Sequence, residues 1–298
     1  MNDITAIIVA KDSPPHIFEA VASIRDIVNE IVILDIGLQQ EIIEKLKDNK
    51  NIRIVPIKKD IPYVELIREE SKSYAKTEYL LFLDPDEIIT QALAKKIIDE
   101  YKKYDYISMP RKNIIFGKWI EHARWWPDHQ IRVFKKNAVI WDKKLHSKPT
   151  ANGNGLTLDA NENLAITHHN YENITEYLMK MIRYAKSEAT EKSKTEYRLG
   201  DALKDGLNEF ISRYFAGEGY KDGMHGFVLS FLQLMYYPLV YFYFWEMKKY
   251  ETVNEKKVVD ETHIFTKKLF FETQHWLGAK KLISFTMQLK NKFLNKLL

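Results

Sequence analysis

Three acidic residues follow an apolar stretch of the sequence and are the first candidates for chemistry. In the run Leu81-Phe82-Leu83-Asp84-Pro85-Asp86-Glu87, Pro85 stiffens the backbone of the turn that carries them. Asp84 and Asp86, separated by one residue, can approach the same bound ion or ribose, and carboxylate oxygens suit Mg²⁺ or Mn²⁺. The alternative is a solvated acidic turn in which Asp84 or Asp86 caps the helix beginning near Thr90.

A second candidate cluster is the run Trp125-Trp126-Pro127-Asp128-His129-Gln130-Ile131-Arg132. Aromatic walls such as Trp126 desolvate a carboxylate and raise its pKa, which favours Asp128 as a general base. Sugars also stack on Trp faces. The alternative is an aromatic corner of the core that holds an Asp128–Arg132 ion pair.

The histidines His146, His168 and His169 each follow an apolar or strand-like run. A single His is more often structural than a metal ligand. His146 becomes a candidate ligand only if Asp84 and Asp86 hold a metal.

The elements that must position these residues alternate between strands and helices up to about Pro110. This pattern predicts an α/β fold with a mainly parallel sheet flanked by helices. Ligands bind beyond the carboxyl ends of such strands, where Asp35 and Asp84 are expected to close the second and fourth strands. The predicted strands are Ile4–Val9, Glu30–Asp35, Ile52–Pro56, Tyr79–Asp84 and Tyr106–Pro110, and the predicted helices are Pro15–Val28, Gln40–Lys47, Val64–Tyr74 and Gln91–Tyr104.

The helical period fades after Arg111, where aromatic, Asn, Gly and Pro residues become frequent. We expect two short strands here, Gln130–Phe134 and Ala138–Trp141, as antiparallel additions at the sheet edge. Residues 1–170 are therefore predicted to form one domain, with a ligand-binding half at 1–110 and a second-substrate half at 111–170. Residues 171–298 are predicted to form a helical region.

This helical region contains an uncharged stretch of 19 residues, Phe227–Trp245, long enough to span a membrane. Its Tyr residues and the central Pro238 favour an interfacial or oligomer-buried helix instead. Apolar residues between Leu282 and Leu297 share a helical face bordered by Lys side chains, which suits a membrane surface or packing on the protein's own core.

The composition narrows the possible functions. Apolar residues make up 45% and charged residues 29%, as in an ordinary globular protein. The absence of Cys excludes disulfides, thiolate metal sites and cysteine nucleophiles. A net charge of +4 does not indicate nucleic acid, but Lys248–Leu298 holds 11 Lys against 5 acidic residues, which suits an anionic membrane surface. The start, with Asp3 and no basic segment, is unlike a signal peptide, so we expect a cytoplasmic protein at the inner face of the membrane.

Taken in order, these features resemble family-2 glycosyltransferases of the GT-A fold, and in particular the branch of lipopolysaccharide-core glucosyltransferases. The resemblance covers residues 4 to about 246. The matching pieces are Ile7–Asp12, Glu30–Asp35, Arg68, Asp84–Glu87, Phe116–Ile120, Trp126–Phe134, Trp141 with Leu145-His146, His168–Tyr171, Arg183-Tyr184, Glu188-Ala189 and Gly219–Gly223.

The resemblance implies an inverting transfer of a hexose from a nucleotide-sugar, with Mg²⁺ or Mn²⁺ as cofactor. The roles it implies are nucleobase contact for Asp35, ribose contact for Asp84, support of the donor pocket for Lys11 and Arg68, cation binding for Asp86 and His146, base catalysis for Asp128, and acceptor-side contacts for Trp126 and Arg132.

We therefore expect a UDP-hexose donor, a lipid-linked or cell-envelope glycan acceptor, a membrane surface and a homo-oligomer as partners. A second hypothesis is an inactive scaffold of the same fold at the membrane, because Ile36–Gln40, Glu69 and Ser147 depart from the family pattern. A nucleotidyltransferase ranks last, because Lys11–Pro15 is not the Gly-rich loop such enzymes use to hold phosphate.

Overall fold

The computed structural model describes residues 3–59, 61, 64–142, 149–284 and 286–287. Its described parts divide into two compact units. The first is formed by Met1–Ile114 and Trp126–Asn170, and the second by Ile115–Trp125 and Tyr171–Leu298. The loop 115–125 therefore groups with the helical unit, although it precedes the end of the α/β unit in the sequence.

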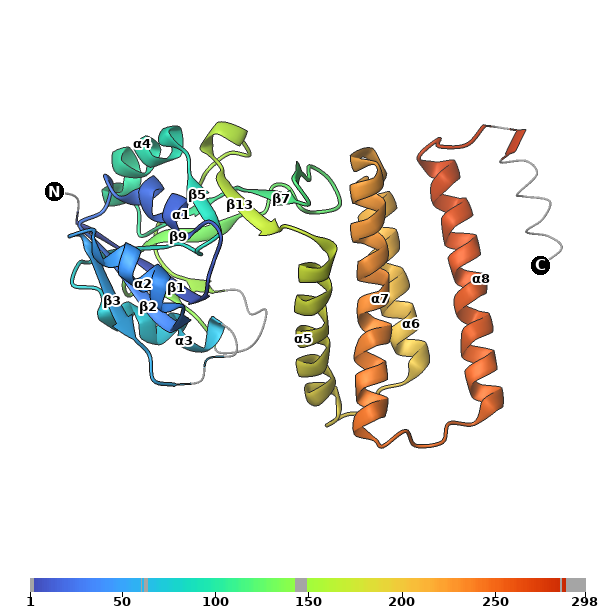
Figure 1. The fold of residues 1–298 in the computed structure, drawn as a ribbon. Helices are drawn as coiled ribbons and strands as arrows, with labels where there is room; N and C mark the ends of the chain where they lie inside the picture. The colour runs from blue at the N-terminus through green and yellow to red at the C-terminus, as the bar shows by residue number, and fades with distance from the viewer. Residues whose placement is uncertain (1–2, 60, 62–63, 143–148, 285, 288–298) are drawn as a thin grey trace. The chain divides into compact units, whose positions relative to one another are not determined.

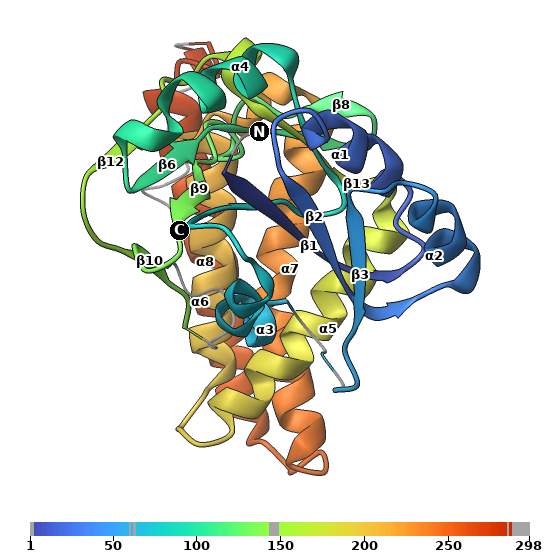
Figure 2. The same cartoon turned by 90° about the vertical axis from the view of Figure 1, so that its left-hand side faces the viewer.

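The first unit is built on a seven-stranded sheet (Figures 1 and 2), in the order β12-β6-β9-β4-β1-β2-β3. Four neighbouring strands, β4-β1-β2-β3, pair in parallel. The strands are β1 (Ile4–Asp12), β2 (Glu30–Leu38), β3 (Ile52–Pro56), β4 (Tyr79–Phe82), β6 (Tyr106–Met109), β9 (Gln130–Lys135) and β12 (Gly155–Thr157).

Strand β9 corrects one expectation. We predicted an antiparallel addition at the sheet edge, but β9 lies inside the sheet and pairs antiparallel with both β4 and β6. Its residues Val133 and Phe134 are buried, and its backbone pairs with a strand on each side, so β9 leaves no edge exposed. The predicted α/β fold class, a mainly parallel sheet flanked by helices and followed by a helical region, is confirmed.

Alternate residues of each strand point to opposite faces of the sheet. Each face has its own buried cluster, and different helices contribute to the two clusters. On β1, Ile4 and Ile8 belong to one buried cluster and Ile7 to the other. The first cluster includes residues of α1 (Ile17–Ile24), α2 (Gln40–Lys47) and α4 (Gln91–Glu100). The second includes residues of α3 (Glu65–Ser71) and the indole of Trp141.

The helix after the acidic turn is capped by Thr90, not by Asp84 or Asp86. The Thr90 hydroxyl accepts a hydrogen bond from the backbone N–H of Leu93 at 3.2 Å. A separate strand, β5 (Glu87–Ile89), lies between the turn and this helix. The capping alternative for the acidic residues is therefore wrong, and their positions need another explanation.

A second sheet brings three polar segments together, with β5, β13 (Ile166–Tyr171) and β7 (Arg111–Ile115) as neighbours. Strand β13 runs antiparallel to β5, which sets His168 opposite Glu87. The remaining short elements are strands β8 (Lys118–Trp119), β10 (Val139–Ile140) and β11 (Thr150–Ala151), and 3₁₀ turns at Lys72–Tyr74, Tyr101–Lys103, Glu162–Leu164 and Gly219–Asp222.

The second unit is helical, as predicted for this part of the chain. Helices α5 and α6 both pack against α7, and α8 packs against α6 (Figure 1). The helices are α5 (Ile174–Lys192), α6 (Leu199–Phe210), a π-helical turn (Ile211–Ala216), α7 (Met224–Met247) and α8 (Glu255–Ala279).

Helix α7 continues through Pro238, although Pro cannot donate the backbone hydrogen bond of a helix. The carbonyl of Leu234, four residues earlier, faces Gly206 of α6. A Cβ at Gly206 would lie 2.3 Å from that carbonyl oxygen. Only Gly permits so close an approach of the two helices at the proline.

Helix α7 is long and apolar enough to cross a membrane, and 28% of its most apolar window is buried inside the protein. Its exposed residues Phe227, Phe231, Met235, Phe242 and Trp245 recur at helical spacing. We name these five the α7 stripe. The second predicted amphipathic segment, Leu282–Leu297, lies mostly outside the described residues.

Candidate functional site

The acidic turn lies at the carboxyl end of β4, because Leu83 continues the strand and hydrogen-bonds to β1 through the carbonyl of Ile7. The turn closes on itself. The backbone N–H of Glu87 donates to the carbonyl of Asp84 at 3.0 Å, and the Asp84 N–H donates to the Glu87 carboxylate at 3.2 Å. Glu87 is fully buried, so this carboxylate is part of the frame of the turn.

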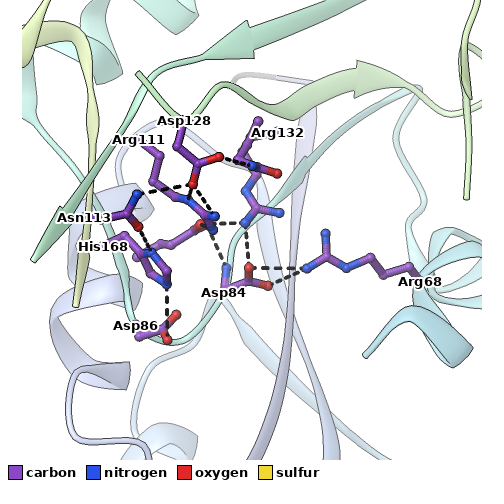
Figure 3. A network of polar contacts seen from close by, with 10 residues as sticks. Arg68, Asp84, Asp86, Arg111, Asn113, Asp128, Arg132 and His168 are labelled. Carbon is purple, nitrogen blue, oxygen red and sulfur yellow. Dashed lines mark hydrogen bonds and ion pairs between the residues drawn. The ribbon is translucent and has the colours of Figure 1, made fainter. Parts of the chain in front are cut away.

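Asp84 is held by two arginines from different elements (Figure 3). Arg68 of α3 donates to both carboxylate oxygens at 2.9 and 3.3 Å, and Arg132 of β9 donates to Oδ2 at 2.5 Å. Burial raises the pKa of Asp84, but the positive charges of Arg132 and Arg68 outweigh it and hold this pKa well below its usual range. Asp84 is therefore ionised at neutral pH.

Glu87 lies between two further guanidinium contacts. The same Nη2 of Arg132 donates to Glu87 Oε1 at 2.5 Å, and Arg111 Nη1 donates to that oxygen at 3.0 Å. Arg132 was expected on the acceptor side, with Asp128 as its possible partner. The structure pairs it instead with Asp84 and Glu87.

Asp128 is the carboxylate that Arg111 holds. Arg111 donates to Asp128 Oδ2 from Nε at 2.8 Å and from Nη2 at 2.5 Å. Asn113 donates to the same oxygen at 3.3 Å, and Gln130 donates to Oδ1 at 2.8 Å. With 26% of its side chain exposed, Asp128 is within reach of a bound molecule. Among the described residues, Asp128 Oδ2 accepts three hydrogen bonds and Oδ1 accepts one.

These contacts overturn our expectation of a raised pKa for Asp128 beside Trp126. Burial does raise the pKa of Asp128, whereas the positive charge of Arg111 and the hydrogen bonds donated to the carboxylate lower it. The lowering effects dominate, and the pKa lies below the usual range of an Asp side chain. The carboxylate is therefore ionised and able to accept a proton.

Asp86 faces His168 of β13. The distance from Asp86 Oδ2 to His168 Nε2 is 3.5 Å, longer than a good N–H···O hydrogen bond. His168 Nδ1 lies 2.6 Å from Asn113 Oδ1, so β7 and β13 link Asp86 to Asp128 (Figure 3). A carboxylate and an imidazole at this separation fit a divalent cation that accepts both donors, such as Mn²⁺. His146, the other predicted ligand, lies outside the described residues.

Asp35 and Lys11 lie along the same sheet edge, because β2 and β1 run parallel to β4. Asp35 does not close its strand. Gly37 adopts a positive φ of 124°, and Asp35 Oδ1 accepts the N–H groups of Gly37 and Leu38 at 2.8 and 2.7 Å. Within the described ranges, no hydrogen bond or ion pair joins Asp35 or Lys11 to the network around Asp84.

The structure adds Glu87, Arg111, Asn113, Gln130 and His168 to the predicted site. Asn113 is fully buried and His168 nearly so. In the sequence, the signal for Arg111, Asn113 and His168 is the presence of polar residues in short runs beside apolar, strand-forming ones, as in Arg111-Lys112-Asn113-Ile114-Ile115 and Ile166-Thr167-His168. Such a pattern does not say which polar residues meet.

This chain is similar, at low sequence identity, to several solved structures. No protein-family model matches the sequence. The S. aureus TarS 1-349 structure in complex with UDP is 13% identical, with 85% of this chain and 93% of that chain covered and a TM-score of 0.43. TarS 1-349 in complex with UDP-GlcNAc is 16% identical over 78% of this chain and 81% of that one, with a TM-score of 0.42. GalNAc-T7 with UDP, GalNAc and Mn²⁺ is 16% identical over 38% and 23%, with a TM-score of 0.30.

Proposed function

We propose that this protein is an inverting, metal-dependent glycosyltransferase that moves a hexose from a nucleotide-sugar, most simply a UDP-sugar, to a hydroxyl of a lipid-linked or cell-envelope glycan. One observation carries the proposal: an ionised, partly exposed Asp128 is joined by buried side chains to the acidic turn at the carboxyl end of β4. A base for the acceptor and carboxylates for the donor are therefore parts of one site.

The transfer is a single displacement. Asp128 Oδ1, which accepts one hydrogen bond from the described residues, has a lone pair for the proton of the acceptor hydroxyl. That hydroxyl oxygen forms a bond to the anomeric carbon of the sugar as the bond to the nucleoside diphosphate breaks. Mg²⁺ or Mn²⁺, when bound, balances the charge of the departing diphosphate.

The remaining residues serve the donor. Asp84 is the proposed ribose contact, held in place by Arg68 and Arg132. Asp35 is the proposed nucleobase contact, and Lys11, at the same sheet edge, is a proposed donor-binding residue. Asp86 and His168 would hold the cation. Trp126, two residues before Asp128 in the sequence, is the proposed stacking surface for the acceptor sugar.

The first test is a thermal-shift screen with UDP, GDP, CMP and ADP, each with and without Mn²⁺. A ligand at about 100 times its dissociation constant adds roughly 2.7 kcal/mol to the folded state. We expect UDP to raise the melting temperature only with Mn²⁺, and to do so less in Asp86→Ala. The absence of any nucleotide effect would overturn the proposal.

We further propose that the protein works at the inner face of the cell membrane, where a lipid-linked acceptor would be found. The exposed aromatic residues of the α7 stripe and the Lys-rich C-terminal segment support this. The double variant Phe227→Gln, Phe231→Gln should sediment less with anionic vesicles than wild type. Phe18→Gln, an exposed Phe in the α/β unit, is the control and should sediment normally.

A second candidate function, an inactive membrane scaffold, is favoured by one observation. The ion pairs of Asp84 and Asp128 with arginines also suit a purely structural network. The scaffold should bind vesicles without binding any nucleotide. The same thermal-shift screen therefore separates the two candidates.

A further inference from the structure

We propose that Asn113 is a positioning residue that couples the cation site at Asp86 and His168 to the base Asp128. This inference rests on the proposed function. Two chains of side-chain contacts, here called routes, connect the acidic turn to Asp128, and the inference concerns the second. The first runs through arginines and Glu87, and the second runs from Asp86 through His168 and Asn113.

The orientation of the Asn113 amide follows from its neighbours. An ionised Asp128 carboxylate can only accept hydrogen bonds, so the group 3.3 Å from Oδ2 must be the amide NH₂ of Asn113. The amide oxygen then points to His168 Nδ1 at 2.6 Å. Because that oxygen only accepts, Nδ1 must carry the proton.

This proton on Nδ1 determines what the other ring nitrogen of His168 can do. In the neutral ring, Nε2 then has a lone pair, and it faces Asp86 Oδ2 at 3.5 Å. Two acceptors that face each other repel. A divalent cation bound to both removes the repulsion, and two neighbouring ligands of one such ion lie about 3 Å apart, given metal–oxygen bonds of about 2.1 Å.

The opposite tautomer of His168 is incompatible with the hydrogen bonds of this route. If Nε2 carries the proton and donates to Asp86, Nδ1 becomes an acceptor, and the Asn113 amide must turn its NH₂ towards His168. The amide oxygen would then face the carboxylate of Asp128, which repels it. Cation binding and a correctly held base therefore favour the same amide orientation, and each must strengthen the other.

Burial makes this coupling strong. Asn113 is 0% exposed and His168 5% exposed, so bulk water does not replace a mismatched partner. The contrast is Gln130, which donates to the other oxygen of Asp128 from a half-buried position. None of the described hydrogen bonds joins Gln130 to His168. Gln130 is therefore a matched control, because it touches the same carboxylate without touching the route.

The test measures Mn²⁺ affinity in the presence of UDP by calorimetry, in the full-length protein. Asn113→Leu should bind Mn²⁺ about ten- to a hundredfold more weakly, as for residues that orient metal ligands. Gln130→Met should bind it as wild type does. Unchanged affinity in Asn113→Leu, or equal weakening in both variants, would overturn the coupling.

Two further measurements keep the inference separable from the proposed function and from misfolding. Asp86→Ala should abolish Mn²⁺ binding. If it does not, the cation site and the proposed function fail together, whereas loss in Asp86→Ala with no effect of Asn113→Leu removes the coupling alone. In the wild-type protein, nitrogen NMR of the His168 ring with Mg²⁺ and UDP should show the proton on Nδ1. A proton on Nε2 in the loaded protein would contradict the inference without any variant.

Discussion

Arg111 donates two hydrogen bonds to a single oxygen of Asp128, Oδ2, at 2.8 and 2.5 Å. This relationship divides the carboxylate into two oxygens with different tasks. Oδ2 is anchored to the protein by three hydrogen bonds, and Oδ1 is the oxygen that the proposed mechanism assigns to the acceptor hydroxyl. The same guanidinium also holds the buried Glu87, so the orientation of Asp128 depends on the acidic turn.

Asp128→Asn should lower the rate of sugar transfer by about 10²- to 10⁴-fold, the usual contribution of a general base. An amide retains the shape of the side chain but cannot take the proton. Stabilisation by UDP with Mn²⁺ should be nearly unchanged, and a thermal shift measures this. Transfer at the wild-type rate would remove Asp128 from the role of base.

Arg111→Lys should move the acidic limb of the kcat/KM profile to higher pH. In the proposed mechanism the base is the ionised form of Asp128, so activity should be complete above its pKa and be lost as the pH falls through it. Arg111 helps to hold this pKa below the usual Asp value of about 3.9. A lysine supplies fewer hydrogen bonds, so the pKa should rise.

The neighbouring variant Lys112→Arg is the control for Arg111→Lys, because Lys112 lies on the same strand but pairs with Glu162. Its pH profile should match that of wild type. An acidic limb that stays in place in Arg111→Lys would show that Asp128 does not govern it.

Glu87→Gln should lower the free energy of unfolding by about 3–5 kcal/mol, measured by urea denaturation. Glu87 is fully buried, and two guanidinium groups depend on its charge. Glu41→Gln is the control, because Glu41 forms an exposed pair with Lys45 within one helix. Surface pairs of this kind contribute little. Equal effects of the two substitutions would mean that Glu87 is not a structural centre.

Gly206→Ala should destabilise the helical unit by about 1–3 kcal/mol, because its Cβ would meet the Leu234 carbonyl oxygen at 2.3 Å. Gly200→Ala in the same helix is the matched control. There the nearest atoms belong to the flexible side chain of Glu261, at 3.3 Å or more, and Ala favours a helix by up to about 1 kcal/mol over Gly. A thermal melt in which both variants behave alike would contradict the proposed close contact at Pro238.

Local patterns in the sequence predicted the strands and helices up to about residue 110, but not the short strands β5, β7, β12 and β13. The expected strand Ile52–Pro56 and helix Gln40–Lys47 are observed with the same bounds, and β1 and β2 extend three residues beyond their predicted ends. These elements follow from apolar periodicity and turn residues, which act over a few positions. The long uncharged helix and the helical character of the region after residue 171 could be predicted from the sequence for the same reason.

The partners of the acidic residues depended on the tertiary structure. Asp128 and Arg132 lie four residues apart, yet the bulge-containing antiparallel strand β9 carries Arg132 to Asp84, and Arg111 takes its place beside Asp128. Pairings of this kind join residues 17 to 48 positions apart. No local pattern encodes them.

The sequence by itself therefore determined the fold class and the acidic turn, because hydrophobic periodicity and turn chemistry are local. Only the tertiary structure decided that Asp128 is held ionised by Arg111, and that Asn113 and His168 join it to Asp86. The physical reason is that burial and ion pairing, which set the charge and orientation of a carboxylate, depend on neighbours supplied by distant strands.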